Sequence, residues 1–274
     1  MNSPNGAVVA EDVTYYRHPA GPLLARLYAP VGRAPTVAVV SLHGGRWIGE
    51  TRLTNAVIDE ALAAAGALVM AIDIRMPPSA RYADCLADIN AAIRWLKAHA
   101  AERGVKPDAV GGIGTSSGGH QMMLSAMRPN DPRYASLSMP GKMDASLAFV
   151  VLGWPVVDPL ARYRYAQAGN KTPYLEAHHA YWPGVADMEE GNPQMILERG
   201  EKVPLPPVLL IQGTADEALT PDMADRFAAA YRKAGGTLDL EKYEGQPHTF
   251  ITKSPEAAAS VAAIEKIVSF VTRR

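Results

Sequence analysis

The chain has 274 residues, of which 48% are hydrophobic and 20% are charged, as in ordinary globular proteins with a sizeable core. Its net charge is −1 and it contains no run of like charges, which argues against a nucleic-acid-binding protein and against a basic membrane-binding patch. Its one cysteine, Cys85, excludes an internal disulfide framework and a metal site built from several cysteines.

Strand-like and helical segments alternate along the first half of the chain. Period-two alternation predicts a strand over 23–30, and continuous apolar runs at 36–42 and 67–74 are typical of strands covered on both faces. Between these two runs, residues 54–66 predict a helix that ends at a glycine. Residues 80–104 predict an amphipathic helix, because apolar side chains recur there at helical spacing. Its apolar face consists of Tyr82, Leu86, Ile89, Ile93 and Leu96.

The second half continues this alternation and ends in a helix. It predicts a strand and glycine-rich turn at 109–117, a helix at 118–127, strands at 146–155 and 207–213, a helix at 221–234, a strand at 238–245 and a helix at 255–271. Such alternation is typical of an α/β fold in which a mostly parallel central sheet carries helices on both faces. We therefore predict a single α/β domain over residues 1–274.

Residues 153–204 interrupt the alternation with a segment rich in aromatic residues and proline. It is too long for a plain loop, and we expect a helical lid over the carboxyl edge of the sheet, where open α/β sheets bind ligands. Its arginines, Arg162 and Arg164, either favour an anionic substrate or lie on the surface. Its aromatic residues either form a wall of the substrate pocket or make the lid's own small core. They are Trp154, Tyr163, Tyr165, Tyr181 and Trp182.

The segment Gly114-Thr115-Ser116-Ser117-Gly118 carries the candidate nucleophile, Ser116. It has the form G-x-S-x-G between a predicted strand and a predicted helix, the setting of a nucleophile elbow that exposes its serine hydroxyl. Small residues two positions before and after the serine let the backbone fold tightly on itself. Ser117 does not fit this frame, because residue 115 is not a glycine. The alternative is a glycine-rich turn that only packs closely.

A serine needs a base to become nucleophilic, and the base needs an orienting acid. His248 lies in a predicted loop between the last strand and the last helix, and Asp216 follows the strand at 207–213. With Ser116 they give the order nucleophile, acid, base, and each residue follows a strand. Glu217 is a rival for the acid. Asp216 is alternatively a turn or helix-capping residue, and His248 is alternatively a surface histidine.

Together these segments resemble the α/β-hydrolase superfamily. The stretches concerned are HGGRW at 43–47, GTSSGG at 114–119, GTADEALTP at 213–221 and GQPHTF at 245–250. More narrowly, they resemble esterases with an H-G-G motif: the hormone-sensitive-lipase-like, kynurenine-formamidase-like and feruloyl or acetyl esterases. Residues 72–96 are similar to a further segment of that group, although IRMPP departs from its usual Y-R-L-A-P. The resemblance extends over nearly the whole chain from residue 23.

The resemblance implies an α/β-hydrolase fold with a lid and the mechanism of a serine hydrolase. In that mechanism Ser116 attacks an acyl carbonyl, His248 acts as general base and then general acid, and Asp216 orients the imidazole. A covalent acyl-enzyme forms and water removes it. The oxyanion hole that the family implies consists of the backbone N–H groups of Gly44, Gly45 and Ser117.

Two residues next to this glycine pair are candidates for the substrate pocket. The family's commonest motif has a third glycine where this chain has Arg46. Arg46 is either a solvated loop residue or a contact for a substrate carboxylate at the pocket entrance. We expect Trp47 to pack or to line the acyl pocket. The pocket candidates are therefore Arg46, Trp47, Trp154, Tyr181 and Trp182.

We predict a serine esterase of the carboxylesterase type, which cleaves small esters with short acyl or aryl-acyl groups and needs no cofactor. The first alternative is an arylformamidase, which would hydrolyse an N-formyl aromatic amine with the same residues. The second is a non-catalytic ligand-binding member of the fold, but such proteins typically lack one of the three catalytic residues. The remaining histidines show no metal-ligand spacing, so we expect no metal.

The expected partner is the small-molecule ester substrate, with no nucleic acid and no membrane. The oligomeric state stays open between a monomer and a homodimer. The N-terminus lacks the pattern of a secretory signal, and no apolar stretch approaches the ~18 residues that a membrane-spanning helix needs. We therefore expect a soluble, cytoplasmic protein.

Overall fold

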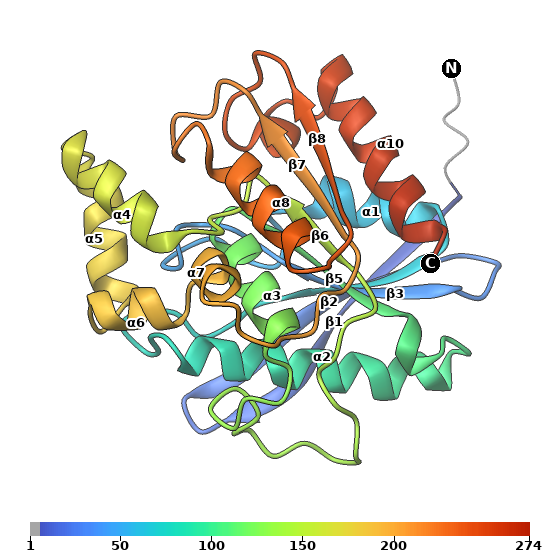
Figure 1. Cartoon of the computed structure of the whole chain (residues 1–274). Coiled ribbons are helices and arrows are strands. Elements are labelled where there is room, and N and C mark those ends of the chain that lie inside the picture. The colour runs from blue at the N-terminus through green and yellow to red at the C-terminus, as the bar shows by residue number, and fades with distance from the viewer. Residues whose placement is uncertain (1–5) are drawn as a thin grey trace.

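The computed structural model describes residues 6–274, and its centre is an eight-stranded sheet (Figure 1). Across the sheet the strands follow the order β1-β2-β4-β3-β5-β6-β7-β8. β2 pairs antiparallel with both β1 and β4, and every other neighbouring pair is parallel. The strands are β1 (Val8–His18), β2 (Gly21–Pro30), β3 (Val37–Leu42), β4 (Ala67–Ile72), β5 (Val110–Thr115), β6 (Val150–Gly153), β7 (Val208–Gly213) and β8 (Leu238–Tyr243).

Helices cover both faces of the sheet, which confirms the predicted fold class (Figure 1). On one face α1 and α10 bury Leu62 and Ile267, and on the other α2, α3 and α8 bury Ile93, Met122 and Phe227. No helix within residues 6–274 is long and apolar enough to cross a membrane. The helices are α1 (Ala56–Ala64), α2 (Asp84–Glu102), a 3₁₀ turn (Pro107–Ala109), α3 (Ser117–Met127), α4 (Pro159–Ala168), α5 (Thr172–Tyr181), α6 (Val185–Glu190), α7 (Pro193–Glu198), α8 (Met223–Lys233), α9 (Phe250–Lys253) and α10 (Ala258–Thr272).

The central strands lie between two apolar layers. Strands β3 to β7 are buried along their whole length. The continuous apolar runs predict this for β3 and β4. Successive side chains of β3 point to opposite faces. Val37 and Val39 belong to the layer under α1 and α10, whereas Ala38 and Val40 belong to the layer under α2, α3 and α8. Because both faces of the sheet are packed against helices, the strands are held in place, and with them the loops at their carboxyl ends.

Several elements differ from the sequence prediction, three of them as follows. β1 is not predicted by the pattern, because it is an outer strand with mostly exposed or half-buried side chains. The strand predicted at 146–155 is restricted to Val150–Gly153, since the chain turns away at Trp154, whose φ is 38°. The helix predicted at 80–104 begins only at Asp84.

The segment between β6 and β7 leaves the sheet and forms α4 to α7. Asp158 caps α4 by accepting a hydrogen bond from the Ala161 N–H (3.0 Å), and Asn192 caps α7 through the Met195 N–H (3.1 Å). α4 and α5, in yellow, lie side by side beyond one end of the sheet (Figure 1). This is the segment 153–204 that the sequence marks as a lid.

Candidate active site

Ser116 lies in the turn between β5 and α3, in a backbone conformation that side chains rarely adopt, with φ 51° and ψ −118°. The glycines on either side make this turn sterically feasible. A Cβ on Gly114 would come within 2.3 Å of the Gly118 carbonyl oxygen. A Cβ on Gly118 would come within 2.1 Å of the His43 carbonyl oxygen. Both positions therefore need glycine, as the strained turn at a nucleophile elbow requires.

Three side chains form a chain of hydrogen bonds at the carboxyl end of the sheet. The Ser116 hydroxyl donates to His248 Nε2 over 2.9 Å, and His248 Nδ1–H donates to Asp216 Oδ2 over 2.7 Å. Ser116 follows β5, Asp216 follows β7, and His248 lies between β8 and α9. The structure thus brings together the three residues that the sequence selected, and Glu217, the rival acid, is exposed.

Asp216 is held as a carboxylate by three donors. Burial alone would raise its pKa, but the hydrogen bonds from His248, from Gln212 Nε2 (2.9 Å) and from the Ala218 N–H (2.8 Å) outweigh that effect and lower the pKa. The carboxylate is therefore ionised at neutral pH. An ionised Asp216 fixes the proton of His248 on Nδ1 and leaves Nε2 free to accept the serine proton.

The loop that follows β3 lies directly against Ser116. A Cβ on Gly44 would lie 3.1 Å from the Ser116 Cβ, which is closer than side-chain atoms normally approach, so the absence of a Cβ lets the two residues pack closely. Gly45 has a φ of 83°, and a Cβ there would come within 2.1 Å of the Gly49 carbonyl oxygen. The Trp47 N–H donates to the Ser117 hydroxyl over 3.0 Å, which ties this loop to the turn at Ser116.

Trp47 is buried and belongs to an aromatic cluster instead of the pocket wall. Its ring stacks on Tyr181 with centroids 5.1 Å apart and meets Trp182 edge-on at 5.8 Å. Its indole N–H donates to His120 Nδ1 over 3.2 Å, and His120 Nε2–H donates to the Gly191 carbonyl oxygen over 2.8 Å. Burial lowers the pKa of His120 to about 4 and outweighs the opposite effect of the bond to Gly191, so this histidine is neutral at neutral pH.

Of the pocket candidates, Trp47, Tyr181 and Trp182 are not among the residues that line the cavity at Ser116. All three are at most 2% exposed, and their rings face one another. They fill the space between the lid segment and α3, which is the second of the two roles that the sequence left open for the lid aromatics. Trp154 does line the pocket, and its ring meets the His248 ring at 6.4 Å.

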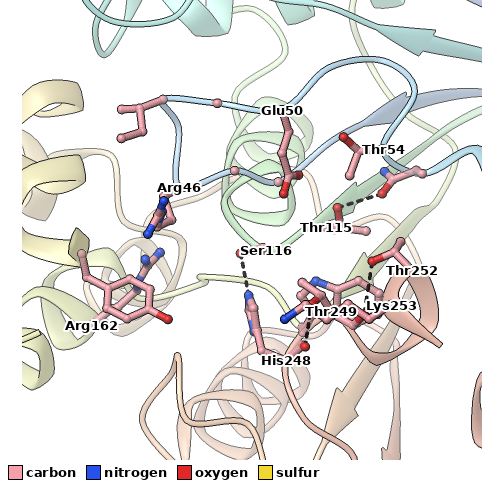
Figure 2. Close-up of a pocket in the computed structure, with 17 residues that line it drawn as sticks. Arg46, Glu50, Thr54, Thr115, Ser116, Arg162, His248, Thr249, Thr252 and Lys253 are labelled. Atoms are coloured by element: carbon pink, nitrogen blue, oxygen red, sulfur yellow. Dashed lines mark hydrogen bonds between the residues drawn. The ribbon is translucent and has the colours of Figure 1, made fainter.

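A cavity of about 520 Å³ opens at Ser116 and His248 (Figure 2). Arg46 and Trp154, both predicted as pocket residues, line it. The sequence did not point to several others, because they lie in helices or loops without a recognisable motif. These are Ile48, Glu50, Thr54, Asn55, Tyr174, Thr249, Thr252 and Lys253.

Glu50 brings a carboxyl group into this cavity (Figure 2). Its Oε2 lies 3.4 Å from the position that a Cβ on Gly44 would take. Partial burial raises its pKa, although His248, Arg46 and the Gly44 N–H favour the ionised form. Arg46 has a left-handed backbone with φ 56°, the region that suits the family's glycine at this position. Within residues 6–274, no group of three or more histidine, cysteine, aspartate or glutamate side chains is arranged to hold a metal ion.

Comparison with known proteins agrees with this geometry. Residues 39–252 match the family model described as alpha/beta hydrolase fold. Two relatives from Mycobacterium tuberculosis are the probable carboxylic ester hydrolase LipM, 27% identical over 248 residues, and the esterase LipC, 30% identical over 216 residues. The matches cover 88% and 75% of this chain but 55% and 52% of those proteins, so the chain spans about half of their length.

A solved structure extends the likeness to three dimensions. The propionate-bound esterase Est2 of Thermogutta terrifontis superposes with a TM-score of 0.77 at 26% identity, over 96% of this chain and 94% of that one. The family model covers most of the chain, including the turn at Ser116 and the loops that carry Asp216 and His248. The chain belongs to the α/β-hydrolase family.

Proposed function

We propose that the protein hydrolyses small carboxylic esters through an acyl-enzyme on Ser116. The observation that carries this proposal is the pair of hydrogen bonds from Ser116 to His248 and from His248 to Asp216, at the mouth of a cavity. A serine hydroxyl becomes a nucleophile when a neutral imidazole accepts its proton and a carboxylate holds that imidazole.

In the proposed reaction, Ser116 Oγ attacks the ester carbonyl while its proton passes to His248 Nε2. Asp216 stabilises the resulting imidazolium, and His248 returns the proton to the departing alcohol oxygen. A water molecule then attacks the acyl-enzyme with His248 again as base, which releases the carboxylic acid and restores Ser116. All the groups in these steps belong to this chain.

The oxyanion of the tetrahedral intermediate needs donors that are in place before the reaction. We assign this role to the backbone N–H groups of Gly44, Gly45 and Ser117. The close approach of Gly44 to Ser116 and the bond from Trp47 to Ser117 support the assignment, because they hold both segments around the reacting carbon. One such donor contributes about 3–4 kcal/mol to lowering the barrier.

We also propose that residues 153–204 act as the lid of a single hydrolase domain. Arg162 of α4 and Tyr174 of α5 line the same cavity as Ser116, which supports this role. The name of LipM and the propionate-bound and butyrate-bound structures of Est2 support an ester substrate with a short acyl group. A cavity of about 520 Å³ is of the size that holds such a small ligand.

Hydrolysis of p-nitrophenyl butyrate tests the proposal. We expect turnover by the wild type and a fall of about 10⁴-fold or more in kcat for Ser116→Ala. Ser125→Ala is the matched control, since Ser125 is buried in α3 and its hydroxyl has no hydrogen-bond partner among residues 6–274. A wild type without esterase activity, or one that prefers N-formylkynurenine by orders of magnitude in kcat/KM, would contradict the proposal.

A further inference from the structure

Arg162, in α4, is a buried cation that has no hydrogen-bond acceptor and no salt-bridge partner among the described residues. Its side chain is only 1% exposed. Among residues 6–274, no hydrogen-bond acceptor contacts its Nε, Nη1 or Nη2. Arg164, two residues further along the same helix, is exposed. Of the two lid arginines that the sequence left undecided, one therefore lies on the surface and the other lies inside.

A buried guanidinium without partners is unfavourable. An ion loses its hydration when it is buried, and buried charges are therefore normally paired. The guanidinium lies 4.6 Å from the ring centroid of Tyr174 and 5.3 Å from that of Trp47, and contacts of this kind with an aromatic face attract a cation. The two rings stabilise the cation in part but supply no acceptor for its five N–H groups.

The guanidinium nevertheless keeps its charge. Burial lowers the pKa of Arg162 to about 10, and the neighbouring Arg46 contributes to this fall. At neutral pH the group is therefore still protonated. A charged side chain with five unused donors fits an anion that is absent from the protein itself.

Arg162 faces the cavity that holds Ser116. The nitrogen atoms of Arg46 and Arg162 lie near each other on one side of this cavity, and Ser116 and His248 face them (Figure 2). Glu50 lies on a different side (Figure 2). Lys253 of α9 also lines the cavity, away from the two arginines (Figure 2). The pair of arginines comes from the loop after β3 and from the lid segment.

We propose that Arg162, with Arg46 at the rim, binds a carboxylate carried by the substrate, so that the preferred substrates are small esters with a second, free acid group. This inference rests on the proposed ester hydrolysis and specifies its substrate class. A planar carboxylate matches the guanidinium fork with two parallel hydrogen bonds, and it would give the buried cation the acceptors that it lacks. The aromatic rings of Trp47 and Tyr174 would then hold the fork in position.

Two pairs of substrates test this inference with the unmodified protein. In the first pair the carboxylate is in the acyl part: mono-p-nitrophenyl glutarate is compared with p-nitrophenyl valerate. In the second it is in the alcohol part: 4-acetoxybenzoate is compared with its neutral methyl ester. We expect the anionic member of one pair to have a kcat/KM about 10- to 100-fold higher, the range for hydrogen bonds to a charged group. That pair also shows which side of the ester faces Arg162.

Variants of the two lid arginines show whether Arg162 causes the preference. In Arg162→Gln the ratio of anionic to neutral kcat/KM should fall towards one, mainly through a higher KM for the anionic member. Arg162→Lys should restore part of the ratio, because an ammonium keeps the charge but loses the fork. Arg164→Gln is the matched control on the same helix and should keep the wild-type ratio. A role in packing alone would change both members of a pair alike.

The outcomes separate this inference from the proposed esterase activity. If the wild type hydrolyses the neutral esters equally well or better in both pairs, the carboxylate site is refuted and the esterase remains. If no ester is hydrolysed, calorimetric titration of monomethyl glutarate and dimethyl glutarate decides. Binding of the monoanion alone, abolished in Arg162→Gln, would support the site without the reaction, and the absence of such binding would refute it. The substrate pairs are compared on the wild type. The proposal can therefore be refuted even if Arg162→Gln does not fold.

Discussion

The two sides of the cavity differ in how their polar groups are satisfied. On the sheet side, Ser116, His248 and Asp216 are joined by hydrogen bonds of 2.7–2.9 Å, and Asp216 has two further donors. On the lid side, Arg162 is buried, and no hydrogen-bond partner for its side-chain nitrogens lies within residues 6–274. The proposed catalytic residues thus find their hydrogen-bond partners within the protein. The guanidinium on the lid side has no acceptor there, and a bound ligand could supply one.

On the sheet side, the substitution with the largest expected effect is Asp216→Asn. We expect kcat to fall by about 10⁴-fold, because the amide no longer holds the proton of His248 on Nδ1 and cannot stabilise the imidazolium. The measurement is the rate of p-nitrophenyl butyrate hydrolysis at neutral pH. Glu217→Gln is the control, since Glu217 is adjacent in sequence but exposed. An equal loss in both variants would mean that the acid has been assigned wrongly.

A smaller effect should follow from displacing the loop beside Ser116. Gly45→Ala forces a Cβ against the Gly49 carbonyl oxygen at a φ of 83°, so the loop must move away from the reacting carbon. We expect kcat to fall by about 10²- to 10³-fold, as when an oxyanion donor is lost. Gly32→Ala is the control, because Gly32 has a similar φ of 76° in open space. Wild-type kcat in Gly45→Ala would remove Gly45 from the proposed oxyanion hole.

Trp47→Phe tests the aromatic cluster that supports the lid side. The change removes the hydrogen bond to His120 and part of the stacking area on Tyr181, and it leaves a buried imidazole nitrogen without a donor. We expect a loss of about 1–3 kcal/mol in the free energy of unfolding, measured in urea. Trp95→Phe is the control, since Trp95 is only half-buried, and it should cost less than about 1 kcal/mol. An equal cost at both positions would argue against a supporting role for the cluster.

Asp59 in α1, on the face of the sheet opposite α3, is another buried group without a well-placed hydrogen-bond partner in the described part of the chain. It shows whether such a group always indicates a ligand. Within residues 6–274 neither of its carboxyl oxygens has a partner at good hydrogen-bonding geometry. Burial raises its pKa to about 8, although the nearby Ser41 hydroxyl acts in the opposite direction. Unlike Arg162, it avoids an unpaired charge by staying protonated at neutral pH.

The raised pKa of Asp59 fixes the sign of a pH effect. Its contribution to stability is fully present below the ordinary pKa of 3.8 and is lost as the pH rises towards 8, because only the folded state retains the proton. Asp59→Asn should remove this slope and raise the free energy of unfolding at pH 8 by about 1 kcal/mol. The measurement is the free energy of unfolding of the wild type and of Asp59→Asn, determined with denaturant from pH 4 to pH 8. If the two free energies changed with pH in the same way, Asp59 would be ionised in the folded protein.

Much of the sheet side could be predicted from the sequence because its signals are local. A glycine-flanked serine after a strand, and an acid and a histidine after later strands, suffice to select Ser116, Asp216 and His248, since parallel strands bring their carboxyl ends to one edge. The glycines around Ser116 were expected for the same steric reason that the structure gives.

The lid side could not be predicted in this way, because its side chains contact residues that are distant in the sequence. Arg162 and Arg164 are chemically equal in the sequence, and only the packing of α4 against Trp47 and Tyr174 buries one and exposes the other. Tyr181 and Trp182 are equally compatible with a pocket wall and a core. Glu50 reaches the cavity only because the loop after β3 turns back on itself.

Covalent labelling by paraoxon tests the central claim, that Ser116 is the nucleophile, most directly. A serine that passes its proton to a neighbouring imidazole can attack the phosphorus of paraoxon, displace p-nitrophenolate and keep the diethylphosphoryl group. Intact-mass measurement should show one diethylphosphoryl group per chain, peptide mapping should locate it on Ser116, and Ser116→Ala should stay unlabelled. Labelling of a different residue, or an unlabelled wild type, would contradict the account.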